Sequence, residues 1–159
     1  MKYFALILAF IMSVTAFSQV SLKGYTLGKK LKGVDKRHTT VAGIEGTLSA
    51  KTLIDDRIFM ITFVSVDYTE NFKNKIKIQK YQLDNLLEGV EKKYGVMLNL
   101  KDKEQYKYST FDFGYKASKD GVVYDVSVQE EGDNSYVVGL AIATEDLVLE
   151  YNGEIQSDF

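Results

Sequence analysis

The sequence predicts an α+β domain in two layers, in which a curved antiparallel sheet of about five strands carries one main helix packed across it, in the order β-β-α-β-β-β. Two observations predict the sheet: apolar and polar residues alternate in several runs, and polar gaps separate the last three of these runs. A third observation predicts the helix, because apolar residues in one segment recur at steps of three and four. No repeat or Pro-rich linker divides the chain, so residues 19–159 are expected to form a single domain.

Two extended segments come first. The run VAGIEGTLSAKTLI, from Val41, alternates as a half-buried strand does, and it leads to Asp55 and Asp56, which suit a tight turn. The next run, RIFMITFVSV, is apolar on both faces and predicts a central strand that is covered on both sides. On one face of this strand we expect Phe59, Ile61 and Phe63.

The main helix is predicted in QKYQLDNLLEGVEKKYG. Lys92 and Lys93 followed by Gly95 are typical of a helix end, because cations favour the last turn and glycine favours the position after it. The start stays open, since the preceding NKIKIQK also alternates like a strand. The apolar face of the helix is predicted to consist of Leu83, Leu86, Leu87, Val90 and Tyr94.

Three strands are predicted after the helix, in YSTFDFGYKA, VVYDVSVQ and SYVVGLAIA. The polar segments SKDG and EEGDN between them fit hairpin turns, which predicts an antiparallel meander. The final apolar run, DLVLEY, is interpreted as an edge strand or a short helix.

The N-terminus has the features of a secretory signal peptide. Lys2 precedes an apolar run at residues 4–12, and the small residues Ala16 and Ser18 follow it. The run is roughly half of the ~20 residues that a transmembrane helix needs. We therefore expect residues 1–18 to be a signal peptide cleaved between Ser18 and Gln19, and the mature chain to be periplasmic or secreted without a stable membrane anchor.

Composition excludes several classes of function. The chain contains no cysteine, which rules out a lipid-anchored bacterial lipoprotein, disulfides, thiol catalysis and thiolate zinc sites. The 20 basic and 22 acidic side chains nearly balance, which argues against a nucleic-acid partner. The densest basic run, GKKLKGVDKRH, is interrupted by Asp35 and is interpreted as a solvated loop, with a basic binding patch as the alternative.

No catalytic residue is assigned. His38 is the only histidine and would be the natural general base, but it lies in DKRHTT without a G-x-S-x-G or H-E-x-x-H context. We expect an exposed loop histidine, and a turn role for Asp55 and Asp56. The alternative is a hydrolase-like or small-ligand site under the sheet that uses His38 or carboxylates such as Asp112 and Asp125.

No cofactor or metal is expected. Four residues of one turn could supply oxygen ligands to calcium, but their spacing is not that of an EF-hand loop. These residues are Glu130, Glu131, Asp133 and Asn134. The glycines of KGYTLGKKLKG lack the spacing and the hydroxyl residue of a phosphate-binding loop.

Tyrosine is the most suggestive residue type, with 11 tyrosines and 9 phenylalanines in a chain without tryptophan. Tyr106 and Tyr108 fall on the opposite parity to Phe111, Phe113 and Tyr115, which indicates a bulge or a connection that turns them outward. Exposed tyrosines suit the binding of a protein or a sugar ring. The alternative is that they cover the open edge of the sheet, because tyrosine also has a high strand propensity.

The order YTLGKKL, IDDRIFMITF and EKKYGV, between Tyr25 and Val96, resembles small exported proteins of bacteria whose envelope has two membranes. The layout is also similar to β-lactamase-inhibitor-like proteins and outer-membrane assembly lipoproteins. The chain departs from those lipoproteins because it lacks the anchoring cysteine and shows no N-terminal helix pair. The resemblance implies a binding protein and identifies no functional residue.

Together these observations predict a non-catalytic, exported binding module of the cell envelope. Its partner would be a protein or an envelope component that docks on one face or edge of the sheet, and Tyr106 and Tyr108 are the candidate binding residues. Alternatives are a protein that binds a small ligand or a carbohydrate, and an enzyme with a site under the sheet.

Overall fold

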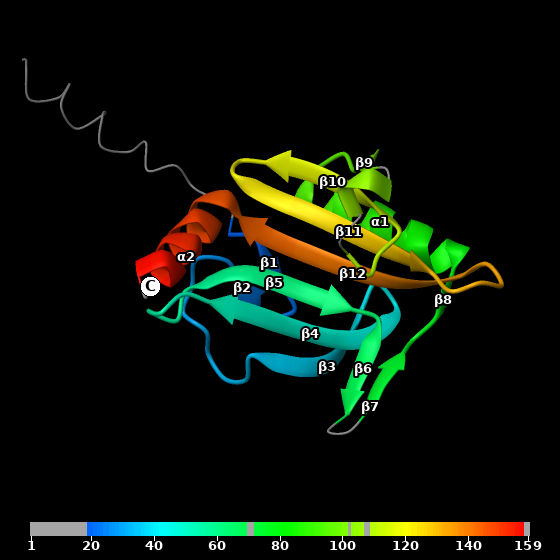
Figure 1. Cartoon of the computed structure of the whole chain (residues 1–159), viewed down its shortest axis with the longest axis horizontal. Helices are drawn as coiled ribbons and strands as arrows, with labels where there is room; N and C mark the ends of the chain where they lie inside the picture. The colour runs from blue at the N-terminus through cyan, green and yellow to red at the C-terminus, as the bar shows by residue number, and fades with distance from the viewer. Residues whose placement is uncertain (1–18, 70–71, 102, 107–108, 158–159) are drawn as a thin grey trace, which may run out of the picture.

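The computed structural model describes residues 19–69, 72–101, 103–106 and 109–157 (Figure 1). The strands before the main helix are β1 (Ser21–Leu22), β2 (Tyr25–Thr26), β3 (Lys36–Val41), β4 (Ile44–Thr52), β5 (Ile58–Val64), β6 (Val66–Thr69), β7 (Phe72–Lys75) and β8 (Ile78–Gln79). The main helix α1 (Lys80–Tyr94) is followed by β9 (Asn99–Lys101), the 3-10 helix η1 (Lys103–Tyr106), β10 (Phe113–Lys119), β11 (Val122–Glu130), β12 (Ser135–Thr144) and the C-terminal helix α2 (Glu145–Ser157).

The main sheet has eight strands, and its neighbouring strands are antiparallel. The order is β3-β4-β5-β12-β11-β10-β9, and β8 also pairs with β12. The centre therefore joins β5 and β12, which come from opposite halves of the chain (Figure 1). The predicted meander of the last three strands is confirmed as β10, β11 and β12.

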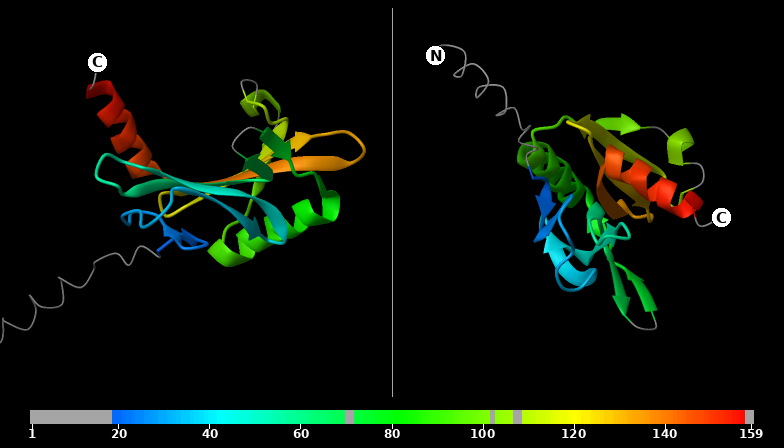
Figure 2. Two further views of the ribbon diagram at one scale, coloured as in Figure 1. Left: turned by 90° about the horizontal axis from the view of Figure 1, so that it is seen from below. Right: turned by 90° about the vertical axis from the view of Figure 1, so that its left-hand side faces the viewer.

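The two helices lie on opposite faces of the sheet (Figure 2). Helix α1 covers one face together with the small β1–β2 hairpin, and Leu83, Leu86 and Val90 are its buried residues. The main core lies between this layer and the sheet, where Phe63 and Val126 have no exposed surface. The predicted α+β class with an antiparallel sheet and one main helix is thus confirmed, whereas the prediction of about five strands is wrong. A second helix, α2, follows at the C-terminal end of the described chain.

Strand β3, which pairs with β4, was not predicted. The run from Val41 does not form one strand, because Ala42 and Gly43 have φ angles of 49° and 77° and make a tight turn between β3 and β4. Strand β3 begins in the basic run GKKLKGVDKRH, which was interpreted as a loop. It lies at the edge of the sheet and only Val41 is buried, so it has no apolar alternation that would reveal it.

The C-terminal run DLVLEY forms part of helix α2 rather than an edge strand. Opposite Lys51 and Thr52 the register of β5 shifts, so that Met60 and Ile58 pair with them and Phe59 is the extra residue of a bulge. Phe59 is buried outside the main core cluster, and its ring stacks on Tyr151 of α2 at a centroid distance of 4.5 Å. The prediction that Phe59 shares a face with Ile61 and Phe63 is therefore wrong, because the bulge turns Phe59 to the other face. There the ring of Phe59 provides a contact on which α2 packs.

Helix α1 begins at Lys80, after the two-residue strand β8. Gln79 caps it: its side chain accepts from the N3 backbone amide, and its own backbone amide donates to the Gln82 side chain at 3.0 Å. Gly95 ends it with a φ of 62°, as predicted. In NKIKIQK, Asn74 and Lys75 thus belong to β7 and Ile78 and Gln79 belong to β8, and the helix starts after them.

Candidate functional site

His38 lies on the edge strand β3 and not in a loop. Its side chain is 50% exposed, as expected, and its Nδ1 lies 3.6 Å from Oδ1 of Asp67. In the sheet order β3 is four strands from β11, which corresponds to about 19 Å at ~4.8 Å per strand. His38 is therefore far outside hydrogen-bond reach of Asp125 on β11, another candidate residue for a site under the sheet.

Asp125 is at the centre of a cluster of polar side chains on the face of the sheet opposite α1. Its Oδ1 accepts hydrogen bonds from the Tyr106 hydroxyl at 3.1 Å and from Ser127 Oγ at 2.9 Å, and its Oδ2 lies 3.0 Å from Lys116 Nζ. Burial and the charge of Asp125 raise the pKa of Tyr106 above its ordinary value. The carboxylate thus has three partners and serves as the centre of a structural network.

Tyr106 is only 7% exposed, which differs from the prediction of an outward-facing ring. It packs over Gly114 of β10, where a Cβ atom would lie 2.2 Å from the tyrosine hydroxyl oxygen. Tyr108 lies outside the described residues. A binding role for the pair stays a prediction, although the contacts of Tyr106 are those of a residue that covers the sheet.

Asp112 lies before β10 and accepts a hydrogen bond from the Glu130 backbone amide at 2.8 Å. Lys116 is the strand partner of Asp125, so Asp112 and Asp125 are offset by four residues, or about 13 Å at ~3.3 Å per residue. Paired catalytic carboxylates are about 5–10 Å apart. The structure therefore does not bring the two aspartates together as an acid and base pair.

Two of the other acidic candidates, Asp55 and Glu131, have structural partners. Asp55 lies in the turn before β5 and accepts hydrogen bonds from Arg57, which lowers the pKa of its carboxyl, and Asp56 has a φ of 68°. Glu131 in the turn after β11 pairs with Lys75. Within the described ranges no group of three or more His, Cys, Asp or Glu side chains is arranged to hold a metal ion.

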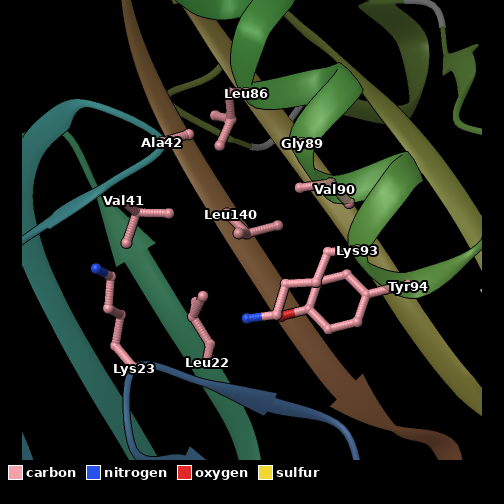
Figure 3. Close-up of a pocket in the computed structure, with 10 residues that line it drawn as sticks. All are labelled: Leu22, Lys23, Val41, Ala42, Leu86, Gly89, Val90, Lys93, Tyr94 and Leu140. Carbon is pink, nitrogen blue, oxygen red and sulfur yellow. The ribbon is translucent and has the colours of Figure 1, made fainter.

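A pocket of about 240 Å³ opens between α1 and the N-terminal part of the chain (Figure 3). Leu140 of β12 lies at its centre, α1 forms one wall, and the turn between β3 and β4 forms the opposite one. The β1–β2 hairpin closes one end. The lining residues are Leu22, Lys23, Val41, Ala42, Leu86, Gly89, Val90, Lys93, Tyr94 and Leu140.

The charge of the pocket is confined to one end. Figure 3 shows Lys23 and Lys93 on either side of Leu22, whereas Leu86 and Ala42 lie at the other end. The Lys93 side chain as a whole is exposed, but its ammonium group reaches over the pocket, and its pKa is lowered by burial and by the charge of Lys23. The pocket thus combines an apolar interior with two cationic groups at one end.

Tyr94 connects the end of α1 to the β1–β2 hairpin. Its hydroxyl donates to the Ser21 carbonyl oxygen at 2.9 Å, and its ring lies against that of Tyr124 at a centroid distance of 4.9 Å. Burial raises the pKa of its hydroxyl. Because this hydroxyl already has an acceptor, the lysines are the polar groups of the lining that remain available as donors to a ligand.

Gly89 provides room in the wall formed by α1. A glycine in the middle of a helix costs about 0.5–1 kcal/mol relative to alanine, and an added Cβ here would meet no atom within 4 Å. The empty space beside the backbone is part of the pocket. The position would therefore accept a side chain without a clash, and a large side chain would fill the pocket.

Comparison with known proteins does not assign a function to this chain. No family model, curated protein or solved structure matches it. Among the helices that the structure describes, none combines the length and the apolar character of a membrane span. The functional interpretation therefore depends on the pocket and on the strand edges.

Sequence reasoning missed the pocket. Its residues come from the hairpin, the β3–β4 turn, α1 and β12, which are far apart in the chain, so no local pattern marks it. Lys93 was interpreted as a helix-end cation and Lys23 was not considered. The one local signal was Gly89, which interrupts an otherwise strong helix pattern.

Proposed function

We propose that this chain is an exported, non-catalytic binding protein of the cell envelope and that the pocket beside α1 is its binding site. The observation that carries the proposal is an apolar pocket with its only charged groups at one end, a composition typical of small-ligand sites. The leader-like residues 1–18 support a periplasmic or secreted location.

The alternative of a hydrolase is less well supported. The pocket lining contains no carboxylate, histidine or hydroxyl nucleophile other than Tyr94, whose hydroxyl is engaged with Ser21. His38, Asp112 and Asp125 lie apart from one another and do not line this pocket. A binding role needs only the apolar walls and the two lysines of the pocket. Acid–base catalysis needs titratable groups within hydrogen-bond reach of one another.

Replacing Gly89 by phenylalanine is expected to block the pocket. The new ring would occupy the space that binds a neutral apolar dye such as N-phenyl-1-naphthylamine, so dye affinity measured by fluorescence titration should fall at least tenfold. Gly89→Ala is the matched control, because it adds one methyl group, should stabilise α1 by about 0.5–1 kcal/mol in urea unfolding, and should retain dye binding. Equal dye affinity of Gly89→Phe and the natural protein would refute this binding site.

A second candidate function is the docking of an extended peptide on β3. This strand ends the sheet order, and its exposed residues Lys36, Arg37 and His38 favour a segment that carries carboxylates. In a hairpin with a two-residue turn, Val41 and Ile44 form a hydrogen-bonded pair, so alternate residues of β3 direct their amides away from β4. The amide of His38 is therefore one of those that face the free edge.

Proline at position 38 is expected to prevent such docking and to leave the sheet intact, because it removes an outward amide that β4 does not use. His38→Ala is the control, since it removes the imidazole and keeps the amide. A partner captured from envelope fractions by the natural protein and by His38→Ala, but not by His38→Pro, would support strand addition. Capture by all three would exclude it, and similar urea midpoints would show that the variants are folded.

A further inference from the structure

The two lysines of the pocket carry charge that no carboxylate balances in the described part of the chain. Lys75, Lys80 and Lys116 each have an acidic partner within 4.0 Å, whereas no ion pair joins Lys23 or Lys93 to a described carboxylate. Lys93 instead lies over the ring of Tyr94, at 5.2 Å from its centroid, and interacts unfavourably with Lys23. An anion placed between the two ammonium groups would relieve this repulsion.

The rest of the pocket matches a hydrocarbon chain. Starting from the lysine end, the walls are Leu22, Val41, Val90 and Leu86, and the floor is Leu140, all without polar side-chain atoms (Figure 3). A methylene group has about the volume of a water molecule, roughly 30 Å³ in the liquid, so about 240 Å³ holds roughly eight of them. A chain of this length, extended from the lysines toward Ala42, would use the pocket fully.

We propose that the ligand of this pocket is a medium-chain carboxylate, whose hydrocarbon chain lies over Leu140 and whose carboxylate binds Lys23 and Lys93. The inference rests on the proposed function and specifies its ligand class. Neither a neutral apolar molecule nor a cationic amphiphile uses the two ammonium groups. A longer or branched lipid would extend beyond the apolar walls of the pocket.

The test compares three probes of the same chain length by displacement of the neutral dye: decanoate, decanamide and decyltrimethylammonium. We expect decanoate to bind at least tenfold more tightly than decyltrimethylammonium, with decanamide between them. Lys23→Gln and Lys93→Gln should each weaken decanoate binding by about three- to fivefold relative to the dye affinity of the same variant, the effect of one exposed ion pair. Raising the salt concentration should weaken decanoate more than decanamide.

Lys92→Gln is the matched control, because Lys92 is the neighbouring exposed cation of α1 and does not line the pocket. Its decanoate affinity should equal that of the natural protein. A general effect of net charge would instead make all three lysine variants equal and would overturn the assignment. Because Gly89→Phe is expected to lose the dye, its decanoate binding is measured directly by titration calorimetry; loss of that binding would show that decanoate occupies the same pocket as the dye.

The possible outcomes distinguish failure of the proposed ligand class from failure of the proposed binding site. If the dye binds and Gly89→Phe prevents this, but the three probes bind equally and the lysine variants have no effect, the carboxylate ligand is wrong and the binding site stands. If neither the dye nor any probe binds, the proposed function fails as well. If a peptide with a leucine side chain and two glutamates displaces the dye better than decanoate, the pocket is a peptide site and the proposal is overturned.

Discussion

Gly46→Ala is expected to reduce the free energy of unfolding by about 3 kcal/mol or more, a large share of the roughly 5–15 kcal/mol that is typical of a folded domain. A Cβ atom at this position would lie 2.1 Å from the carbonyl oxygen of Val64 and 2.8 Å from the ring of Phe63. The first contact is with backbone and cannot be relieved by a rotamer change. The second is with a side chain that is fully buried, so no space exists into which the ring could move.

The measurement is urea unfolding followed by circular dichroism, with Gly89→Ala as the paired control. Both changes replace glycine by alanine, but the added atom meets nothing within 4 Å at Gly89. We expect the two midpoints to move in opposite directions. A midpoint of Gly46→Ala within error of the natural protein would show that β4 does not approach Val64 as closely as the structure has it.

The elements that the sequence predicted well are those with one buried face. In β11 the alternating residues Val122, Tyr124, Val126 and Val128 are all buried, and in α1 the buried residues follow steps of three and four. Burial of one face is what creates periodicity, so these elements carry their own signal. The turn between β10 and β11 was also readable, because Asp120 and Gly121 both have positive φ.

The elements that were missed lack this signal. Strands β3 and β9 end the sheet, and each has at most one buried residue. The bulge at Phe59 inverts the expected face of one ring, and only its contact with Tyr151, far along the chain, explains the inversion. Tertiary contacts rather than local pattern therefore decide these places.

Tertiary contacts rather than local pattern also decide the candidate site. The pocket residues, Leu140 included, come from four separate parts of the chain, and each is an ordinary residue in its own segment. Lys93 was correctly read as a cation in the last turn of α1, yet its position beside Lys23 depends on how the hairpin docks on Tyr94. A site formed by packing between distant segments leaves no motif in the sequence.

The last prediction concerns Asp125, whose replacement by alanine is expected to reduce the free energy of unfolding by about 2–3 kcal/mol. Its carboxylate is the acceptor for Tyr106 and Ser127 and the ionic partner of Lys116. The change would leave the hydroxyl of a tyrosine that is 7% exposed without this acceptor. Asp125→Asn should be milder, because the amide oxygen still accepts one hydrogen bond.

Urea unfolding of Asp84→Ala gives the matched control. Asp84 is also paired with a lysine, Lys80, but both side chains are more than half exposed, at 53% and 57%, so its loss should change the free energy of unfolding by less than about 1 kcal/mol. Equal losses for the two aspartates would contradict a network around Asp125.

A double-mutant cycle with Tyr106→Phe then separates structure from binding. A coupling of about 1 kcal/mol between Asp125→Ala and Tyr106→Phe, together with unchanged dye affinity, would show that Tyr106 stabilises the sheet. If Tyr106→Phe instead weakened capture of an envelope partner without a change in stability, the tyrosine would belong to a second binding surface. The face of the sheet opposite α1 would then have a function of its own, because the pocket lies on the α1 side.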